Sequence, residues 1–137
     1  MIFDFGFSIF DYPMTEAKLK ARTKAFALCV PKLIDSLPES RLGRVMAGQL
    51  GRSGTSVGAN YRAACRSRSA AEMISKLAMV EEEADESAFW LELISDHGLL
   101  SPAKAVALKQ ETDELTAIMV ASRRTLKSKI ENPKSKI

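Results

Sequence analysis

Residues 41–68 read RLGRVMAGQLGRSGTSVGANYRAACRSR, and this stretch decides the fold. It holds six arginines, no acidic residue and five of the chain's seven glycines. Its apolar residues recur at helical spacing, whereas each glycine inside a helix costs about 1 kcal/mol relative to alanine. The stretch is therefore either a glycine-rich loop or a helix whose glycines allow close approach to a neighbour.

Helical geometry separates these two possibilities. With an advance of about 100° per residue, the side chains of this stretch fall into three groups. One arc of roughly 80° forms an arginine stripe, made of Arg41, Arg44, Arg52, Arg62 and Arg66. The opposite face holds Met46, Leu50, Ser53, Val57, Asn60 and Ala64, and one flank holds Gly43, Ala47, Gly51, Gly54 and Gly58. A loop has no cause to sort residues in this way, so a helix is predicted.

Three further helices are predicted, at about 15–36, 70–96 and 101–129. Thr15, Ser40 and Ser101 suit N-caps, because their side-chain oxygens can accept hydrogen bonds from the first helical turn. A break is expected near Ser67–Ser69, and Gly98 suits the end of the third of the four helices.

Apolar residues recur every three or four positions in the last two helices, which favours packing of long antiparallel helices. The seams are Met73, Leu77, Val80, Ala84, Ser87, Leu91 and Ile94, and then Leu108, Thr112, Leu115, Met119, Ser122 and Leu126. Pro31 should kink the first helix or cut it short. The predicted fold class is all-α, an antiparallel up-and-down four-helix bundle.

The bundle is assigned to residues 14–130. A short extended N-terminal arm is expected over residues 1–13, where phenylalanines alternate with other residues, and a basic tail over residues 131–137. The first residues carry acids where a signal peptide needs bases, and no run approaches the ~20 apolar residues of a membrane span. We expect a cytoplasmic protein without a membrane partner, in which Cys29 and Cys65 stay reduced.

Charge is segregated along the chain. Residues 41–68 carry six bases and no acid, residues 69–100 carry eight acids against one lysine, and residues 123–137 carry six bases against one acid. Such blocks usually form solvated faces and salt bridges between neighbouring helices. A nucleic-acid surface is the alternative explanation.

Catalysis and metal binding find little support. The acids at 81–83, 85 and 86 suggest a di-iron carboxylate centre, but such a centre also needs two histidines. The chain has one histidine, His97, at a predicted helix end, and no nucleophile motif surrounds a serine or cysteine. The glycines lack the lysine and hydroxyl residue of a phosphate loop. We predict no metal, no cofactor and no enzymatic activity.

The arginine stripe is the strongest functional candidate. Arginine binds phosphate in a bidentate manner, so five arginines on one arc can follow an RNA or DNA backbone. Arg123, Arg124 and Lys127 are predicted to extend this surface. The alternative is a purely structural assembly module whose arginines make salt bridges with the acids of the third helix, within the chain or between subunits.

The third helix also predicts an interface. Phe89, Trp90 and Leu93 lie far around the helix from the core seam, and exposed aromatic residues indicate a contact surface. Together with the small residues Gly51, Gly54 and Gly58, they predict a homo-oligomer. The alternative is that the N-terminal arm of the same chain covers this face. Asn60 lies on the apolar side of its helix, where we predict a buried polar contact with Glu83.

The segment QLGRSGTSVGANY at 49–61 resembles the four-helix-bundle family of 23S rRNA-intervening-sequence proteins. The similarity extends over about residues 26–126 and includes RSRS at 66–69, EEADE at 82–86 and FWLEL at 89–93. Two positions differ from the usual pattern: Ala63 stands where relatives often have glutamate, and Pro31 interrupts a helix that is usually continuous.

This resemblance implies an up-and-down bundle that assembles as a ring-like homopentamer. Some members of the family are encoded within inserts in large-subunit ribosomal RNA genes. A similar protein, the accessory protein of diversity-generating retroelements, is basic and associates with nucleic acid and a reverse transcriptase. The resemblance thus implies RNA or DNA and a protein as candidate partners, and it supplies no catalytic residue.

Overall fold

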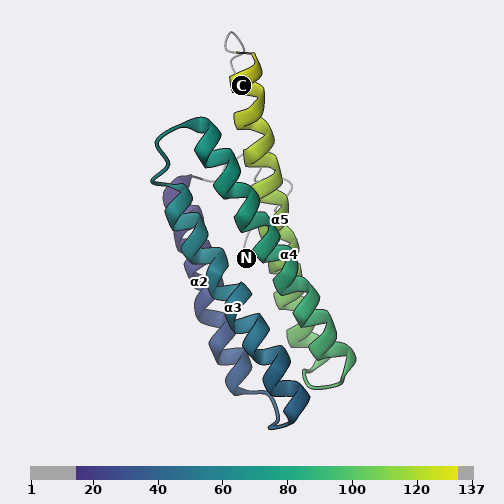
Figure 1. The fold of residues 1–137 in the computed structure, drawn as a ribbon. Coiled ribbons are helices and arrows are strands. Elements are labelled where there is room, and N and C mark those ends of the chain that lie inside the picture. Colours follow the sequence, from purple (N-terminus) through teal and green to yellow (C-terminus); the bar gives the residue numbers. More distant parts are fainter. Residues whose placement is uncertain (1–14, 133–137) are drawn as a thin grey trace.

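The computed structural model describes residues 15–132, which are helical apart from short turns. The four helices are α2 (Glu16–Asp35), α3 (Arg41–Ala64), α4 (Ala70–Asp96) and α5 (Pro102–Glu131). They run up and down in sequence, and each packs against the next (Figure 1). The predicted antiparallel four-helix bundle is confirmed. The arm predicted over residues 1–13 lies outside the described residues, as does all but the start of the predicted tail.

Hydroxyl side chains begin all four helices. Thr15, Ser40, Ser69 and Ser101 each accept a hydrogen bond from the backbone N–H three residues ahead, at 3.1, 2.9, 3.1 and 3.5 Å. These bonds satisfy amides that have no partner within the helix. Three of the four caps were predicted, and Ser69 lies in the predicted break. Gly98 ends α4 with a φ of 74°, which favours glycine.

Pro31 does not cut α2 short, so that alternative of the expectation is wrong, and the predicted kink stays a prediction. The helix continues through the exposed proline as far as Asp35. Val30 and Leu33 on either side of it are buried in the core. Their packing holds the last turn of α2 in place and outweighs the one backbone hydrogen bond that a proline removes.

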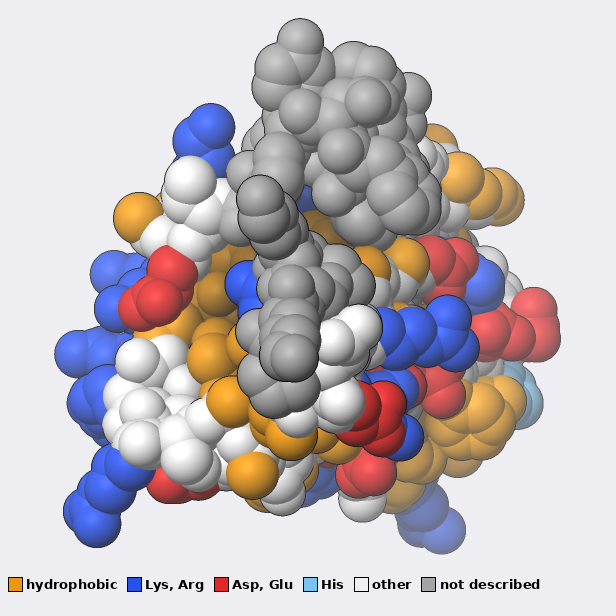
Figure 2. Space-filling view, turned by 90° about the horizontal axis from the view of Figure 1, so that it is seen from above, with side chains coloured by type: hydrophobic (Ala, Val, Ile, Leu, Met, Phe, Trp, Pro, Cys, Tyr) orange, Lys and Arg blue, Asp and Glu red, His pale blue; other side chains and the backbone are white. Residues whose placement is uncertain are grey.

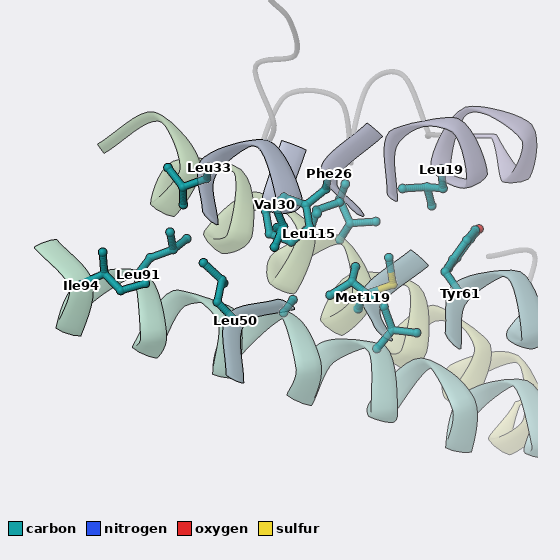
Figure 3. Close-up of a cluster of buried hydrophobic side chains, with 14 of the residues drawn as sticks. Leu19, Phe26, Val30, Leu33, Leu50, Tyr61, Leu91, Ile94, Leu115 and Met119 are labelled. Atoms are coloured by element: carbon teal, nitrogen blue, oxygen red, sulfur yellow. The ribbon is translucent and has the colours of Figure 1, made fainter. Parts of the chain in front are cut away.

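The core follows the predicted faces and runs through the bundle (Figure 3). In the predicted α4 seam every residue is buried except Met73, which is half-buried. The largest fully buried apolar side chains are Leu50, Leu77, Leu91, Ile94, Leu115, Met119, Val30, Val57 and Val80. All four helices contribute to this cluster, so the described chain has one continuous core.

The glycine flank of α3 faces α2. A Cβ atom on Gly54 would lie 2.6 Å from Cγ2 of Val30, and one on Gly58 would lie 3.2 Å from the carbonyl oxygen of Thr23. Close approach of the two helices therefore requires glycine at position 54. Gly54 is buried within its own chain, so its prediction as an oligomer contact is wrong. Gly51 and Gly58 are half-buried at the edge of the same contact.

Candidate functional site

The arginine stripe lies on the outward side of α3, and all five of its residues are exposed. Four of them lie on α3 and span roughly 31 Å, at 1.5 Å per residue, and Arg66 lies in the turn that follows the helix. The ends of the stripe thus belong to opposite ends of the bundle. Arg44 pairs with Glu39 at 3.3 Å, whereas Arg41 forms no ion pair within residues 15–132.

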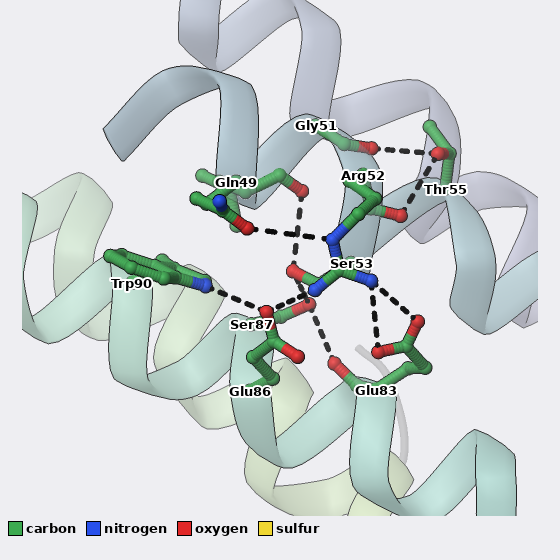
Figure 4. A network of polar contacts seen from close by, with 10 residues as sticks. Gln49, Gly51, Arg52, Ser53, Thr55, Glu83, Glu86, Ser87 and Trp90 are labelled. Carbon is green, nitrogen blue, oxygen red and sulfur yellow. Dashed lines mark hydrogen bonds and ion pairs between the residues drawn. The ribbon is translucent and has the colours of Figure 1, made fainter. Parts of the chain in front are cut away.

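Arg52 joins α3 to α4 (Figure 4). Its Nη1 donates to both carboxylate oxygens of Glu83, at 3.0 and 3.3 Å, and its Nη2 donates to Glu86. The guanidinium Nε also points to the side-chain oxygen of Gln49, at 3.4 Å. This central arginine of the stripe is therefore engaged in a salt-bridge network within the chain, as the structural alternative predicted.

The same network lowers the pKa of the Glu86 carboxyl group. Trp90 donates its indole N–H to Oε2 of Glu86 at 2.9 Å, and this bond, together with Arg52, lowers the pKa of the carboxyl group. Hydrogen bonds to the charged form stabilise it, which is the physical cause of the shift. The guanidinium of Arg52 responds in the opposite sense, and its pKa is raised by the hydrogen bond to Glu86.

The predicted contact between Asn60 and Glu83 is wrong. Glu83 binds Arg52 instead, because the long guanidinium reaches across the outer edge of the helix pair. Asn60 is half-buried and forms no side-chain hydrogen bond within the described part of the chain. The buried polar contact between the two helices is made by Ser53 and Ser87, whose hydroxyl oxygens lie 2.9 Å apart.

Unpaired cations gather at one end of the bundle, where α3 and α5 end and α2 and α4 begin. Lysine and arginine side chains project from the rim of this end (Figure 2). We name it the basic end and define it by seven exposed residues without an ion pair in the described range: Lys18, Arg62, Arg66, Arg68, Arg124, Lys127 and Lys129.

The three residues predicted to extend the arginine stripe onto α5 lie in different surroundings. Arg123 donates to Glu81 of α4, with its Nε at 3.1 Å and its Nη2 at 3.0 Å from the same oxygen, and is half-buried. Arg124 and Lys127 are exposed and belong to the basic end. Fold topology thus brings them to the same end as Arg62 and Arg66, while it leaves Arg41 and Arg44 at the other.

The predicted interface residues of α4 are exposed to different degrees. Phe89 is 52% exposed, whereas Trp90 and Leu93 are half-buried and pack against the core. The rings of Phe89 and Trp90 meet edge to face with centroids 5.1 Å apart. Met79, which lies on the same outward face of α4, is 49% exposed. The outward side of α4 therefore carries two large apolar side chains in contact with solvent.

A groove of about 460 Å³ runs along the outer side of the α2–α3 pair. Its floor consists of small residues, and its rim carries lysine and arginine. The residues that line it are Lys20, Ala21, Lys24, Ala27, Thr55, Gly58, Ala59 and Arg62. Lys20 pairs with Glu16 at 3.7 Å, while Lys24 and Arg62 have no ion pair among the described residues.

Arg22 connects α2 to α5, a contact that was not among the predictions from the sequence. Its Nη2 donates to Glu111 at 2.6 Å and to Glu114 at 2.7 Å, and its Nε donates to Glu111 at 2.9 Å. The side chain is 9% exposed. Burial opposes the charge, but the hydrogen bonds to the two glutamates outweigh it and raise the pKa of Arg22. A second groove, of about 310 Å³, lies beside this contact.

Within residues 15–132, no group of three or more His, Cys, Asp or Glu side chains is placed to hold a metal ion. None of the four helices described has the length and apolar character that a bilayer crossing requires. His97 is exposed at the C-cap of α4.

Comparison with known proteins agrees with this geometry. Residues 16–121 match the model of the family described as 23S rRNA-intervening sequence protein. The chain belongs to this family. The matched range begins with α2 and ends within α5, so it includes most of the bundle.

A solved structure is similar as well. It is a protein of unknown function from the S23 ribosomal protein family of Bacteroides thetaiotaomicron, and it is 28% identical to this chain with a TM-score of 0.74. The similarity covers 80% of this chain and 97% of the other. A search of curated proteins finds no match.

Proposed function

We propose that this family member is a non-enzymatic, cytoplasmic protein that binds RNA or DNA through the basic end of its bundle. The observation that supports the proposal is the set of seven exposed cations without ion pairs at that end. Two of them, Arg66 and Arg68, lie in the α3–α4 connection. Unpaired guanidinium groups are free to bind phosphate in a bidentate manner.

The proposal moves the binding surface from the arginine stripe to the basic end. Arg52 is occupied by two glutamates, and Arg44 by one. A phosphate backbone would have to displace these carboxylates, whereas it meets no such competition at Arg66, Arg68 or Arg124. Phosphate contacts of this kind supply affinity and strong salt dependence without sequence preference.

The test compares two triple variants with the same change in net charge. Arg66→Glu/Arg68→Glu/Arg124→Glu alters the basic end, and Arg41→Glu/Arg44→Glu/Lys104→Glu alters the opposite end. Fluorescence anisotropy with an RNA hairpin and a DNA duplex measures binding over a salt series. We expect roughly tenfold or greater loss for the first variant, with a shallower salt slope, and little change for the second. Equal losses in both, or no binding by the native chain at low salt, would exclude the proposal.

A second function, self-association, is favoured by the exposed apolar side chains of Met79 and Phe89. Apolar surface of this kind on a folded chain indicates a partner. We propose a homo-oligomer, and the family resemblance implies five copies. Sedimentation velocity at micromolar concentration measures the mass directly. A monomer at every concentration would exclude self-association and leave the nucleic-acid proposal intact.

A further inference from the structure

Two surfaces of this chain complement each other. We propose that the outward ridge of α4 in one copy docks into the α2–α3 groove of the next copy. This inference rests on the self-association proposed above and specifies how it occurs. The α4 ridge is defined by Met79, Glu82, Asp85 and Phe89, all of which are exposed.

Shape supports this pairing. The floor of the groove is formed by Ala21, Ala27, Gly58 and Ala59, whose side chains are a methyl group or absent. A surface built in this way accepts large side chains from outside without steric conflict. The α4 ridge presents two of them, Met79 at 49% and Phe89 at 52% exposure. Burial of both on the floor would remove apolar area from water, which drives most protein association.

The charges of the two surfaces independently support the docking of the α4 ridge into the groove. The groove rim carries Lys24 and Arg62, and the α4 ridge carries Glu82 and Asp85. None of these four residues forms an ion pair within residues 15–132. Each surface thus holds unpaired charge of one sign beside apolar contact area. Such complementary patches fix the register of an interface and disfavour wrong pairings.

The heights of the two surfaces along the bundle also agree. The hydrogen bond between Ser53 and Ser87 fixes the register of α3 against the antiparallel α4. Ala59 lies six residues beyond Ser53, roughly 9 Å along the axis, and Glu82 lies five residues before Ser87, about 7.5 Å in the same direction. A rotation about an axis parallel to the bundle therefore brings the ridge of one copy to the groove of another.

This pairing joins two different faces, so an open chain of copies has a free ridge at one end and a free groove at the other until a ring closes. A two-fold dimer built on either surface alone would instead place that surface against itself. Lys24 and Arg62 would then face the same cations, or Glu82 and Asp85 the same acids. Repulsion between like charges opposes that arrangement, and a directional ring is the expected assembly.

Cross-linking in the full chain tests the contact. Native Cys29 and Cys65 are first replaced by serine and alanine. Ala59→Cys and Met79→Cys are then introduced together, and a short bismaleimide is added. We expect a ladder of covalent multimers from the double variant and monomers from each single variant. The control pairs Ala59→Cys with Val106→Cys, an exposed position on α5, and should give no ladder. Dimers from either single variant alone would overturn the directional arrangement.

Charge reversal gives a second measurement. Lys24→Glu or Glu82→Lys should each weaken the assembly by roughly tenfold or more, and the two changes combined in one chain should restore much of it. Lys104→Glu serves as the matched control, because Lys104 is exposed and unpaired in the described structure but lies on α5. An oligomer that resists both reversals and gives no ladder overturns this docking mode alone. A chain that is monomeric throughout overturns the self-association proposal as well.

Discussion

Glu86 shows at the scale of one residue how a surface side chain becomes part of the structure. It accepts from the indole of Trp90 and from the guanidinium of Arg52. Both bonds favour the ionised carboxylate, and they lower the pKa of Glu86. A carboxyl group with a lowered pKa in the folded state stabilises the fold above its unfolded pKa, and that contribution is lost as the pH falls through the folded pKa.

We predict that Glu86→Gln lowers stability at neutral pH, and that its difference from the native chain shrinks as the pH falls below about 4. The physical reason is that the native carboxylate becomes protonated there and resembles the amide. Urea unfolding at a series of pH values measures the effect, and the single tryptophan, Trp90, reports the local environment by its fluorescence. Glu131→Gln is the control, since Glu131 is exposed, forms no ion pair among the described residues and lies outside the α4 ridge. A difference that does not depend on pH would contradict the assigned role.

At the scale of the element, the glycines of α3 differ in how much space surrounds them. An added Cβ at Gly54 would collide with Val30 at 2.6 Å, whereas one at Gly48 would meet no atom within 4 Å. The same substitution should therefore have opposite effects at these two positions. Glycine at 54 allows helix packing, while glycine at 48 only lowers the intrinsic stability of the helix.

We predict that Gly54→Ala destabilises the chain by roughly 1–3 kcal/mol through overpacking. Gly48→Ala should stabilise it by about 1 kcal/mol, because alanine favours the helix and no neighbour is displaced. Thermal and urea unfolding measure both values, and each variant is the control for the other. Stabilisation by both substitutions would show that α2 and α3 do not need this close approach.

Helix positions followed from the sequence because local rules determine them: hydroxyl caps, a glycine end and apolar spacing in α4 and α5. The side-chain contacts between different helices did not follow from the sequence. Ser53 and Ser87 each lay on a predicted core face, so their pairing required only the register of α3 against α4. The partner of Glu83 was misassigned, since the reach of Arg52 depends on how the two helices are rotated. The early end of α2 predicted at Pro31 was wrong because core packing on both sides of the proline outweighs a local penalty.

At the scale of the whole molecule, the seam between α2 and α5 differs from the other helix contacts. The chain packs α2 on α3, α3 on α4 and α4 on α5, and a groove of about 310 Å³ lies at the remaining seam. Arg22 crosses this seam with three hydrogen bonds to glutamates of α5. Its position one turn before Phe26 was the only trace of this role in the sequence.

We predict that Arg22→Met destabilises the bundle by roughly 2–4 kcal/mol, because it leaves Glu111 and Glu114 close together without their cation. Lys18→Met, an exposed change on the same helix, should stay within about 0.5 kcal/mol. Chemical denaturation compares the two variants. A loss no larger than that of the control would mean that apolar packing alone closes the seam.

The position of the basic end has a consequence for kinetics. Positive charge concentrated at one end of a long bundle gives the molecule a dipole along its axis. The field of a polyanion turns such a molecule before contact, so that encounters begin with the basic end foremost. Ionic strength should then act mainly on the association rate, while the dissociation rate depends on the few contacts that form afterwards.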